Sequence, residues 1–146
     1  MKSLDIVFGR KSCRNFSGEP LRKRDMDILL EALRRAPSAG NAQPWFFYAI
    51  KNKSLKKGLA EAAYGQNFFA KAPVVFVICT IPRISSSAYG KRGGNLNCIQ
   101  DTAAAAENLL ITATALGYGS CWVGPGSVPP GEPMRREIPK ISAIID

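Results

Sequence analysis

The stretch "NLNCIQDTAAAAENLLITATALGYG", residues 95–119, decides the fold that the sequence predicts. From Leu96 to Leu116 it is apolar over most of a helical circumference, and Gly117 provides a natural end. A helix that is apolar nearly all round is a buried helix. The four consecutive alanines at 103–106 would let a neighbouring helix approach its backbone closely. The stretch therefore predicts one long buried helix around which the other elements pack.

A second helix is predicted on the amino-terminal side of this one. Met26, Leu29, Leu30 and Leu33 stand at positions i, i+3, i+4 and i+7, which places them on one face of a helix over residues 25–36. Pro37 restricts the residue before it and should end this helix.

The remaining segments predict a mixture of short helices and strands. Apolar, β-branched and aromatic runs favour strands, and the run at 73–81 reads as a central strand buried on both faces. The predicted elements are a short helix at 3–9, a helix at 54–65 capped by Ser54 and ended by Gly65, a flexible polar connection at 83–95, a turn-rich segment at 129–139, and strands at 44–51, 73–81, 119–126 and 140–146. This order indicates an α+β domain with a central sheet.

Composition narrows the class of protein. The chain has 146 residues, 46% of them hydrophobic and 21% charged, which suits a single globular domain over residues 1–146. The apolar run near the amino terminus is too short for a signal peptide, so we expect a cytoplasmic protein. The four cysteines form no C-x-x-C pair, and the chain has no histidine. The sequence therefore offers neither a histidine-based catalytic system nor a recognisable zinc site, and a cofactor would have to supply any redox chemistry.

The charge is strongly basic. Lysine and arginine number 20 against 11 acidic residues, a formal net charge of +9. Three interpretations stay open at this point: a solvated basic surface, a nucleic-acid interface, or sites for small anionic ligands.

Basic and hydroxyl side chains alternate in "RKSCR", residues 10–14. In an extended chain Arg10, Ser12 and Arg14 would point to the same side, with Lys11 beside them. Guanidinium groups bind phosphate oxygens in bidentate fashion, and a hydroxyl adds one donor. The pattern is typical of a phosphate cradle, although an exposed basic stretch with no ligand would look the same.

Small and amide residues follow the second helix in "PSAGNAQPW", residues 37–45. Ser38, Ala39 and Gly40 carry almost no side chain, so a planar ligand could approach the backbone. Asn41 and Gln43 alternate and could turn both amides to one side, where each offers a donor and an acceptor. The alternative is a plain helix stop followed by a turn.

Taken together, and in this order, these motifs make the sequence similar to the nitroreductase family of FMN-dependent oxidoreductases. The resemblance covers nearly the whole chain. Its motifs are "RKSCRNF" at 10–16, "RRAPSAGNAQPW" at 34–45, "AEAAYGQNFFAKAPVVFVIC" at 60–79, "IQDTAAAAENLLITATALGYGSCWVG" at 99–124 and "REIPKISAIID" at 136–146.

The resemblance implies a homodimer of α+β subunits. Each subunit would have a mainly antiparallel central sheet flanked by helices and a long buried helix at the dimer interface, where two FMN molecules bind. It implies ping-pong transfer of electrons from NAD(P)H to a nitroaromatic, quinone or similar acceptor, with the chemistry on the flavin and no catalytic side chain. The residues it assigns to FMN are Arg10, Lys11, Ser12 and Arg14 at the phosphate and ribityl chain, Pro37, Ser38, Ala39, Asn41 and Gln43 at the flavin, Gln66 at the ribityl chain or ring, and Trp122, Val123 and Gly124 along the ring.

Two alternative functions remain open, and the sequence departs from the usual pattern of the family in one respect. The chain could be a flavin-binding or flavin-consuming protein of the same fold without nitroreductase turnover, or a module that binds through its basic surface. Family members usually continue past the closing strand to a later Arg or Lys that adds to the phosphate site. For the sequence as given we therefore expect weaker FMN binding and a less stable dimer, since one charge-assisted contact contributes about 1.5–3 kcal/mol.

Overall fold

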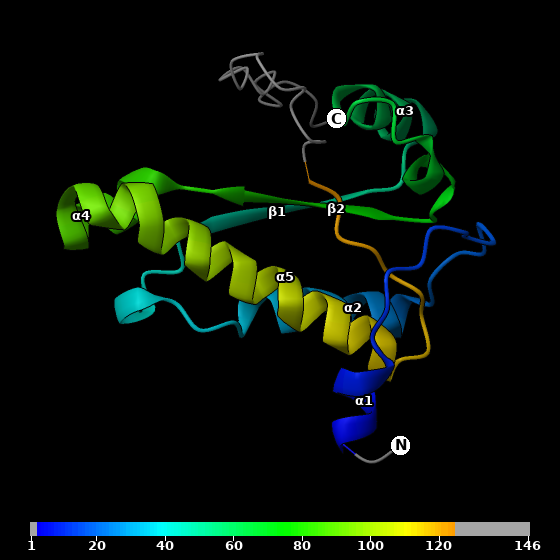
Figure 1. Ribbon diagram of the computed structural model, residues 1–146, viewed down its shortest axis with the longest axis horizontal. Coiled ribbons are helices and arrows are strands. Elements are labelled where there is room, and N and C mark those ends of the chain that lie inside the picture. The colour runs from blue at the N-terminus through cyan, green and yellow to red at the C-terminus, as the bar shows by residue number, and fades with distance from the viewer. Residues whose placement is uncertain (1–2, 125–146) are drawn as a thin grey trace.

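Two helices packed on one face of a two-stranded antiparallel sheet form the centre of the structure, a computed structural model that describes residues 3–124 (Figure 1). The mixture of helices with an antiparallel sheet confirms the α+β prediction. In chain order the elements are α1 (Ser3–Gly9), α2 (Lys23–Arg34), the 3-10 helix η1 (Ala39–Asn41), β1 (Trp45–Ile50), α3 (Lys53–Ala62), the 3-10 helix η2 (Asn67–Lys71), β2 (Val75–Thr80), α4 (Pro82–Arg92), the π-helix η3 (Gly93–Asn97) and α5 (Cys98–Ala115).

The core lies between α2 and α5, which run side by side beneath the strands (Figure 1). Its buried residues are Leu29, Leu33 and Ala36 from the second-helix region and Ala105, Leu109 and Ala113 from α5. The small side chains of α5 let the two helices approach closely, as predicted. The prediction that α5 is buried nearly all round is only partly confirmed, because Ile99 on its outer side is 56% exposed.

The sheet has one face on the helices and one face open. Trp45 and Phe47 of β1 point to the core with Phe76 and Ile78 of β2, and Phe47 pairs with Ile78 in the register. On the opposite face Phe46 is 49% exposed. The prediction of a strand buried on both faces is therefore wrong for the described residues, in which β2 is half-buried and α2 and α5 cover one face.

The segment predicted as a flexible connection, residues 83–95, is instead helical. Pro82 starts α4 at a position where its missing N–H costs nothing. Gly93 brings η3 against α4 so closely that a Cβ there would collide with the backbone carbonyl of Ser85. This packing between two glycine- and serine-rich segments is not visible in local composition, which explains the wrong prediction.

The predicted helix ends need small corrections. α2 begins two residues before the predicted start and ends at Arg34, with Pro37 just beyond. The cap of α3 is Asn52, not Ser54, because the Asn52 side chain accepts from the Leu55 N–H at 3.0 Å. Gly65 does follow the end of α3, with a φ of 74° that suits glycine.

Three predictions concern the carboxyl-terminal part of the chain, most of which lies beyond the described residues. Up to Gly124, the predicted strand at 119–126 forms only an isolated parallel bridge between Ser120 and Ser12. The predicted turn at 129–139 and strand at 140–146 lie outside the described residues. Within residues 3–124, no helix combines the length and apolar character needed to cross a membrane.

Candidate functional site

The segment after α1 carries the predicted phosphate-binding residues. Ser12 forms the bridge with Ser120, and the Cys13 N–H donates to the Ser120 carbonyl at 2.8 Å. Lys11, Ser12 and Arg14 are exposed, whereas Arg10 is half-buried. The bridge holds this segment in the extended form that the sequence predicted.

Two of the cations in this segment have only weak partners within the chain. The Arg10 Nε lies 3.6 Å from the Glu107 carboxylate of α5, and both side chains are partly exposed, so the pair contributes little. The Arg14 guanidinium lies over the Phe68 ring, 5.9 Å from its centroid. Neither Lys11 nor Arg14 forms an ion pair with an acidic side chain in the described part of the chain.

Gln66 joins the end of α3 to Gly124. Its side-chain amide donates to the carbonyls of Ala63 at 3.0 Å and Gly124 at 3.2 Å. Two residues further along the chain, Phe68 lies beneath Arg14. The structure therefore links Ser12 to Ser120, Arg14 to Phe68 and Gln66 to Gly124, whereas Arg10 lies at Glu107 of α5.

A buried hydroxyl at the same place was not predicted. The Ser120 side-chain oxygen is buried and has no hydrogen-bond partner within residues 3–124. Gly119 precedes it, and a Cβ there would lie 2.8 Å from the Cys13 sulfur, so only glycine allows this approach. The glycine directly before it, in the run Gly117-Tyr118-Gly119, is the signal that could have drawn attention to Ser120.

The loop that holds Pro37, Ser38, Ala39, Asn41 and Gln43 is folded, not extended. Asn41 has a φ of 56° and Gln43 a φ of 48°, both in the left-handed region. The Ser38 hydroxyl accepts from the Gln43 N–H at 3.0 Å and closes the loop. The argument that both amides alternate along an extended chain is therefore wrong, although both side chains are exposed.

Asp101 of α5 anchors this loop, which sequence reasoning missed. Its Oδ1 accepts from the Ala39 N–H at 3.0 Å, while its buried Oδ2 has no partner in the described part of the chain. A carboxylate in the first turn of a mostly apolar helix is the signal that could have found it.

The two predicted halves lie at different places along α5. The loop at 37–43 meets the helix at Asp101, whereas the segment at 10–14 meets it at Glu107. Six residues of helix separate these points, about 9 Å along the axis. Figure 1 shows the loop near the beginning of α5 and the amino-terminal segment towards its end. The two halves therefore meet α5 at different turns of the helix.

Comparison with known proteins identifies this arrangement. The profile described as the Nitroreductase family matches residues 7–68 and 61–128, which is most of the chain. The chain belongs to the nitroreductase family.

Individual relatives agree with the family. A protein of Archaeoglobus fulgidus, named as a candidate NADH dehydrogenase/NAD(P)H nitroreductase, is 34% identical over 83% of this chain and 66% of its own length. A crystal structure of a candidate NADH oxidase from Clostridium acetobutylicum superposes with a TM-score of 0.71 at 32% identity, over 85% of this chain and 70% of that one. The structure of an FMN-dependent nitroreductase from Clostridium difficile R20291 superposes with a TM-score of 0.70 at 25% identity, over 82% of this chain and 65% of that one. The chain thus spans about two thirds of the length of these relatives.

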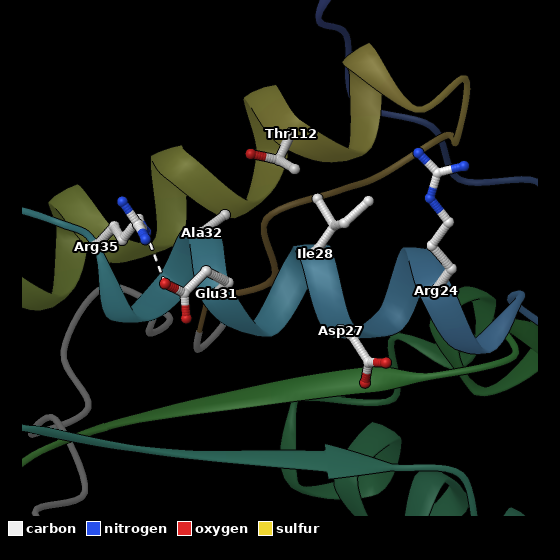
Figure 2. Close-up of a pocket in the computed structure, with 7 residues that line it drawn as sticks. All are labelled: Arg24, Asp27, Ile28, Glu31, Ala32, Arg35 and Thr112. Carbon is white, nitrogen blue, oxygen red and sulfur yellow. Dashed lines mark hydrogen bonds and ion pairs between the residues drawn. The ribbon is translucent and has the colours of Figure 1, made fainter.

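A recess in the described part of the chain lies away from these residues. It has a volume of about 600 Å³ and runs along α2 beside α5, lined by Arg24, Asp27, Ile28, Glu31, Ala32, Arg35 and Thr112 (Figure 2). Arg35 donates to Glu31 at 2.6 Å, and this hydrogen bond lowers the pKa of Glu31. None of the residues predicted to bind FMN lines it, and both of its carboxylates already pair with basic side chains of α2, Asp27 with Lys23 and Glu31 with Arg34 and Arg35.

Proposed function

We propose that this chain is an FMN-dependent oxidoreductase that passes electrons from NAD(P)H to nitroaromatic, quinone or similar acceptors. Its membership of the nitroreductase family and the names of its relatives support the proposal. The absence of histidine from the whole sequence agrees with it, because the redox chemistry would then belong to the cofactor.

The observation that carries the proposal is the set of unneutralised donors at residues 10–14. Lys11 and Arg14 have no acidic partner in the described residues, and the buried Ser120 hydroxyl lies beside the bridge without a hydrogen bond. Cations and hydroxyls with free donors suit a phosphate. Arg10, Lys11, Ser12 and Arg14 would hold the FMN phosphate and ribityl chain.

The remaining residues would hold and orient the ring. The bond from Gln66 to Gly124 fixes the segment with Trp122 and Val123, and Trp122 is 53% exposed, so its ring is available for contact. When bound, FMN would supply the hydride transfer that the side chains cannot perform. The role of the polypeptide would be to bind the cofactor, orient it and shield it from water.

The loop at Pro37, Ser38, Ala39, Asn41 and Gln43 would contact the flavin of a second subunit. Its separation from residues 10–14 along α5 supports this, because the two halves of the site would then come from different chains of a homodimer. The exposed outer side of α5, with Ile99, offers an apolar surface for the interface.

The test is a titration of the purified protein with FMN, followed by NADH or NADPH. We expect a yellow protein whose flavin absorbance bleaches on addition of the reductant. Arg14→Ala should weaken FMN binding about ten- to a hundredfold, whereas Arg24→Ala, an exposed arginine on α2, should not. A yellow protein that does not bleach would indicate flavin binding without turnover. A colourless protein that refuses FMN and binds oligonucleotides in a salt-sensitive way would overturn the proposal.

A further inference from the structure

A second, smaller recess lies away from every residue assigned to FMN. Its volume is about 290 Å³, at the lower end of the range for small-molecule sites. Three lysines line it, Lys51, Lys53 and Lys56, together with apolar side chains that include Leu21, Met26 and Val74. The recess forms where β1 runs into α3 and where the chain enters β2.

The decisive residue is Lys56, which is only 5% exposed. Lysine is almost never buried unless it is paired. The Lys56 Nζ donates to the Ala72 carbonyl at 2.5 Å, and it forms no ion pair within the described residues. An ammonium group has three donors, and within the described residues only the Ala72 carbonyl accepts from this one, with no acidic side chain paired to its charge.

The rest of the recess adds to this positive charge. Lys51 and Lys53 are exposed and lie at the same recess, and no aspartate or glutamate lines it. Glu19 stands next to two lining residues, Gly18 and Pro20, but its carboxylate forms no ion pair in the described part of the chain. Three cations around one recess repel one another unless an anion joins them.

We infer that this recess binds a small organic anion, with a carboxylate or phosphate group held by Lys51, Lys53 and Lys56 and an apolar body packed on Leu21, Met26 and Val74. The apolar walls distinguish this ligand from a simple inorganic ion. The inference does not depend on FMN binding, because the recess shares no residue with the flavin site.

Met26 provides a local reporter for the test. The chain has three methionines, and Met26 is the one that lines the recess within the described residues. Protein labelled with ¹³C-methyl methionine is titrated, with and without added FMN, with benzoate, phenyl phosphate, inorganic phosphate and the neutral isostere benzamide. Met26→Leu assigns the signal. We expect a saturable shift of the Met26 methyl with benzoate or phenyl phosphate, a much weaker response to inorganic phosphate, and none with benzamide.

Matched variants separate the recess from general surface charge. Lys56→Met should weaken binding of the anion about tenfold or more, and the Lys51→Gln/Lys53→Gln double variant should weaken it severalfold. Lys57→Gln removes the next lysine on α3, which does not line the recess, and should leave the affinity unchanged. If Lys56→Met fails to fold, the double variant decides, since both of its side chains are exposed.

Several results would overturn the inference. One is an unchanged Met26 signal with both organic anions. Another is equal binding of benzamide and benzoate, which would remove the role of charge. A third is equal binding by the wild-type protein and the double variant, and a fourth is inorganic phosphate binding as tightly as the organic anions.

Discussion

The carboxylate of Asp101 accepts a hydrogen bond from the Ala39 N–H at 3.0 Å, between residues that are 62 positions apart in the sequence. Asp101 is 7% exposed and lies in the first turn of α5, where the helix dipole favours a negative charge. The bond joins the glycine-containing loop to the central helix. It makes the shape of that loop depend on a residue of the central helix to which the sequence analysis gave no role of its own.

Replacing Asp101 should therefore destabilise the protein and loosen the loop. Asp101→Ala removes a hydrogen bond with an ionised partner and should cost about 1.5–3 kcal/mol of the free energy of unfolding. Asp101→Asn keeps an acceptor oxygen and should cost less. Urea denaturation measures the change, and hydrogen exchange at the Ala39 amide should accelerate in the alanine variant. If Asp101→Ala had the same stability and the same exchange rate at Ala39 as the wild-type protein, the bond would have no role.

Two glycines should respond to alanine in opposite directions. A Cβ at Gly93 would collide with the Ser85 backbone, so Gly93→Ala must push η3 away from α4 and should cost about 1–3 kcal/mol. A Cβ at Gly58, inside α3, meets no atom within 4 Å. Gly58→Ala should therefore stabilise the protein by about 0.8–1 kcal/mol through helix propensity. Urea unfolding measures the change in the free energy of unfolding for each variant. A change of the same sign in both would contradict the close packing of Gly93 on Ser85.

The fold was predictable wherever one segment carried its own periodic signal. The apolar stripe of α2, the aromatic run of β1 and the long apolar run of α5 each identify an element from local residues alone. α4 and η3 were missed because their helices depend on the close approach of Gly93 to Ser85, a contact that polar composition does not reveal. β2 looked like a doubly buried strand because its run is apolar throughout, yet α2 and α5 cover one of its faces.

The candidate site was predictable in its residue types and less so in its geometry. The bridge between Ser12 and Ser120 agrees with the extended segment predicted at residues 10–14. The assignment of Gln66 to FMN stays a prediction. The conformation of the loop at 37–43 was not predictable, because a left-handed φ, which asparagine tolerates at Asn41, is unusual for a glutamine such as Gln43. Asp101 and Ser120 act through contacts distant in sequence, which periodicity does not report.

The beginning of α3 allows a direct test of a corrected cap. Asn52 accepts from the Leu55 N–H at 3.0 Å, so Asn52→Ala should cost about 1 kcal/mol of the free energy of unfolding. Ser54 lies inside the helix and forms no cap bond, and Ser54→Ala should leave stability nearly unchanged or raise it slightly. Thermal or urea unfolding distinguishes the two. A larger loss of stability in Ser54→Ala than in Asn52→Ala would show that Ser54 is the cap, as the sequence predicted.

A buried carboxylate gives the stability a dependence on pH. The Tyr118 hydroxyl donates to the Asp25 Oδ2 at 2.6 Å, and Arg22 donates to the same oxygen at 2.8 Å. The hydrogen bond from Tyr118 is the main cause that lowers the pKa of Asp25, with Arg22 adding to it against the opposing effect of desolvation. The carboxylate form is therefore favoured more in the folded than in the unfolded chain.

The sign of the effect follows from this lowered pKa. The stabilisation is complete above the pKa of an unfolded aspartate and is lost as the pH falls through the lower folded value. Tyr118→Phe should raise the pKa of Asp25 and reduce the stability gained between acidic and neutral pH. Urea unfolding at a series of pH values, for wild type and Tyr118→Phe, measures the two curves. We expect their difference to be largest near neutral pH and to shrink in acid, whereas a difference that is constant with pH would show that Tyr118 stabilises the fold without acting through the charge on Asp25.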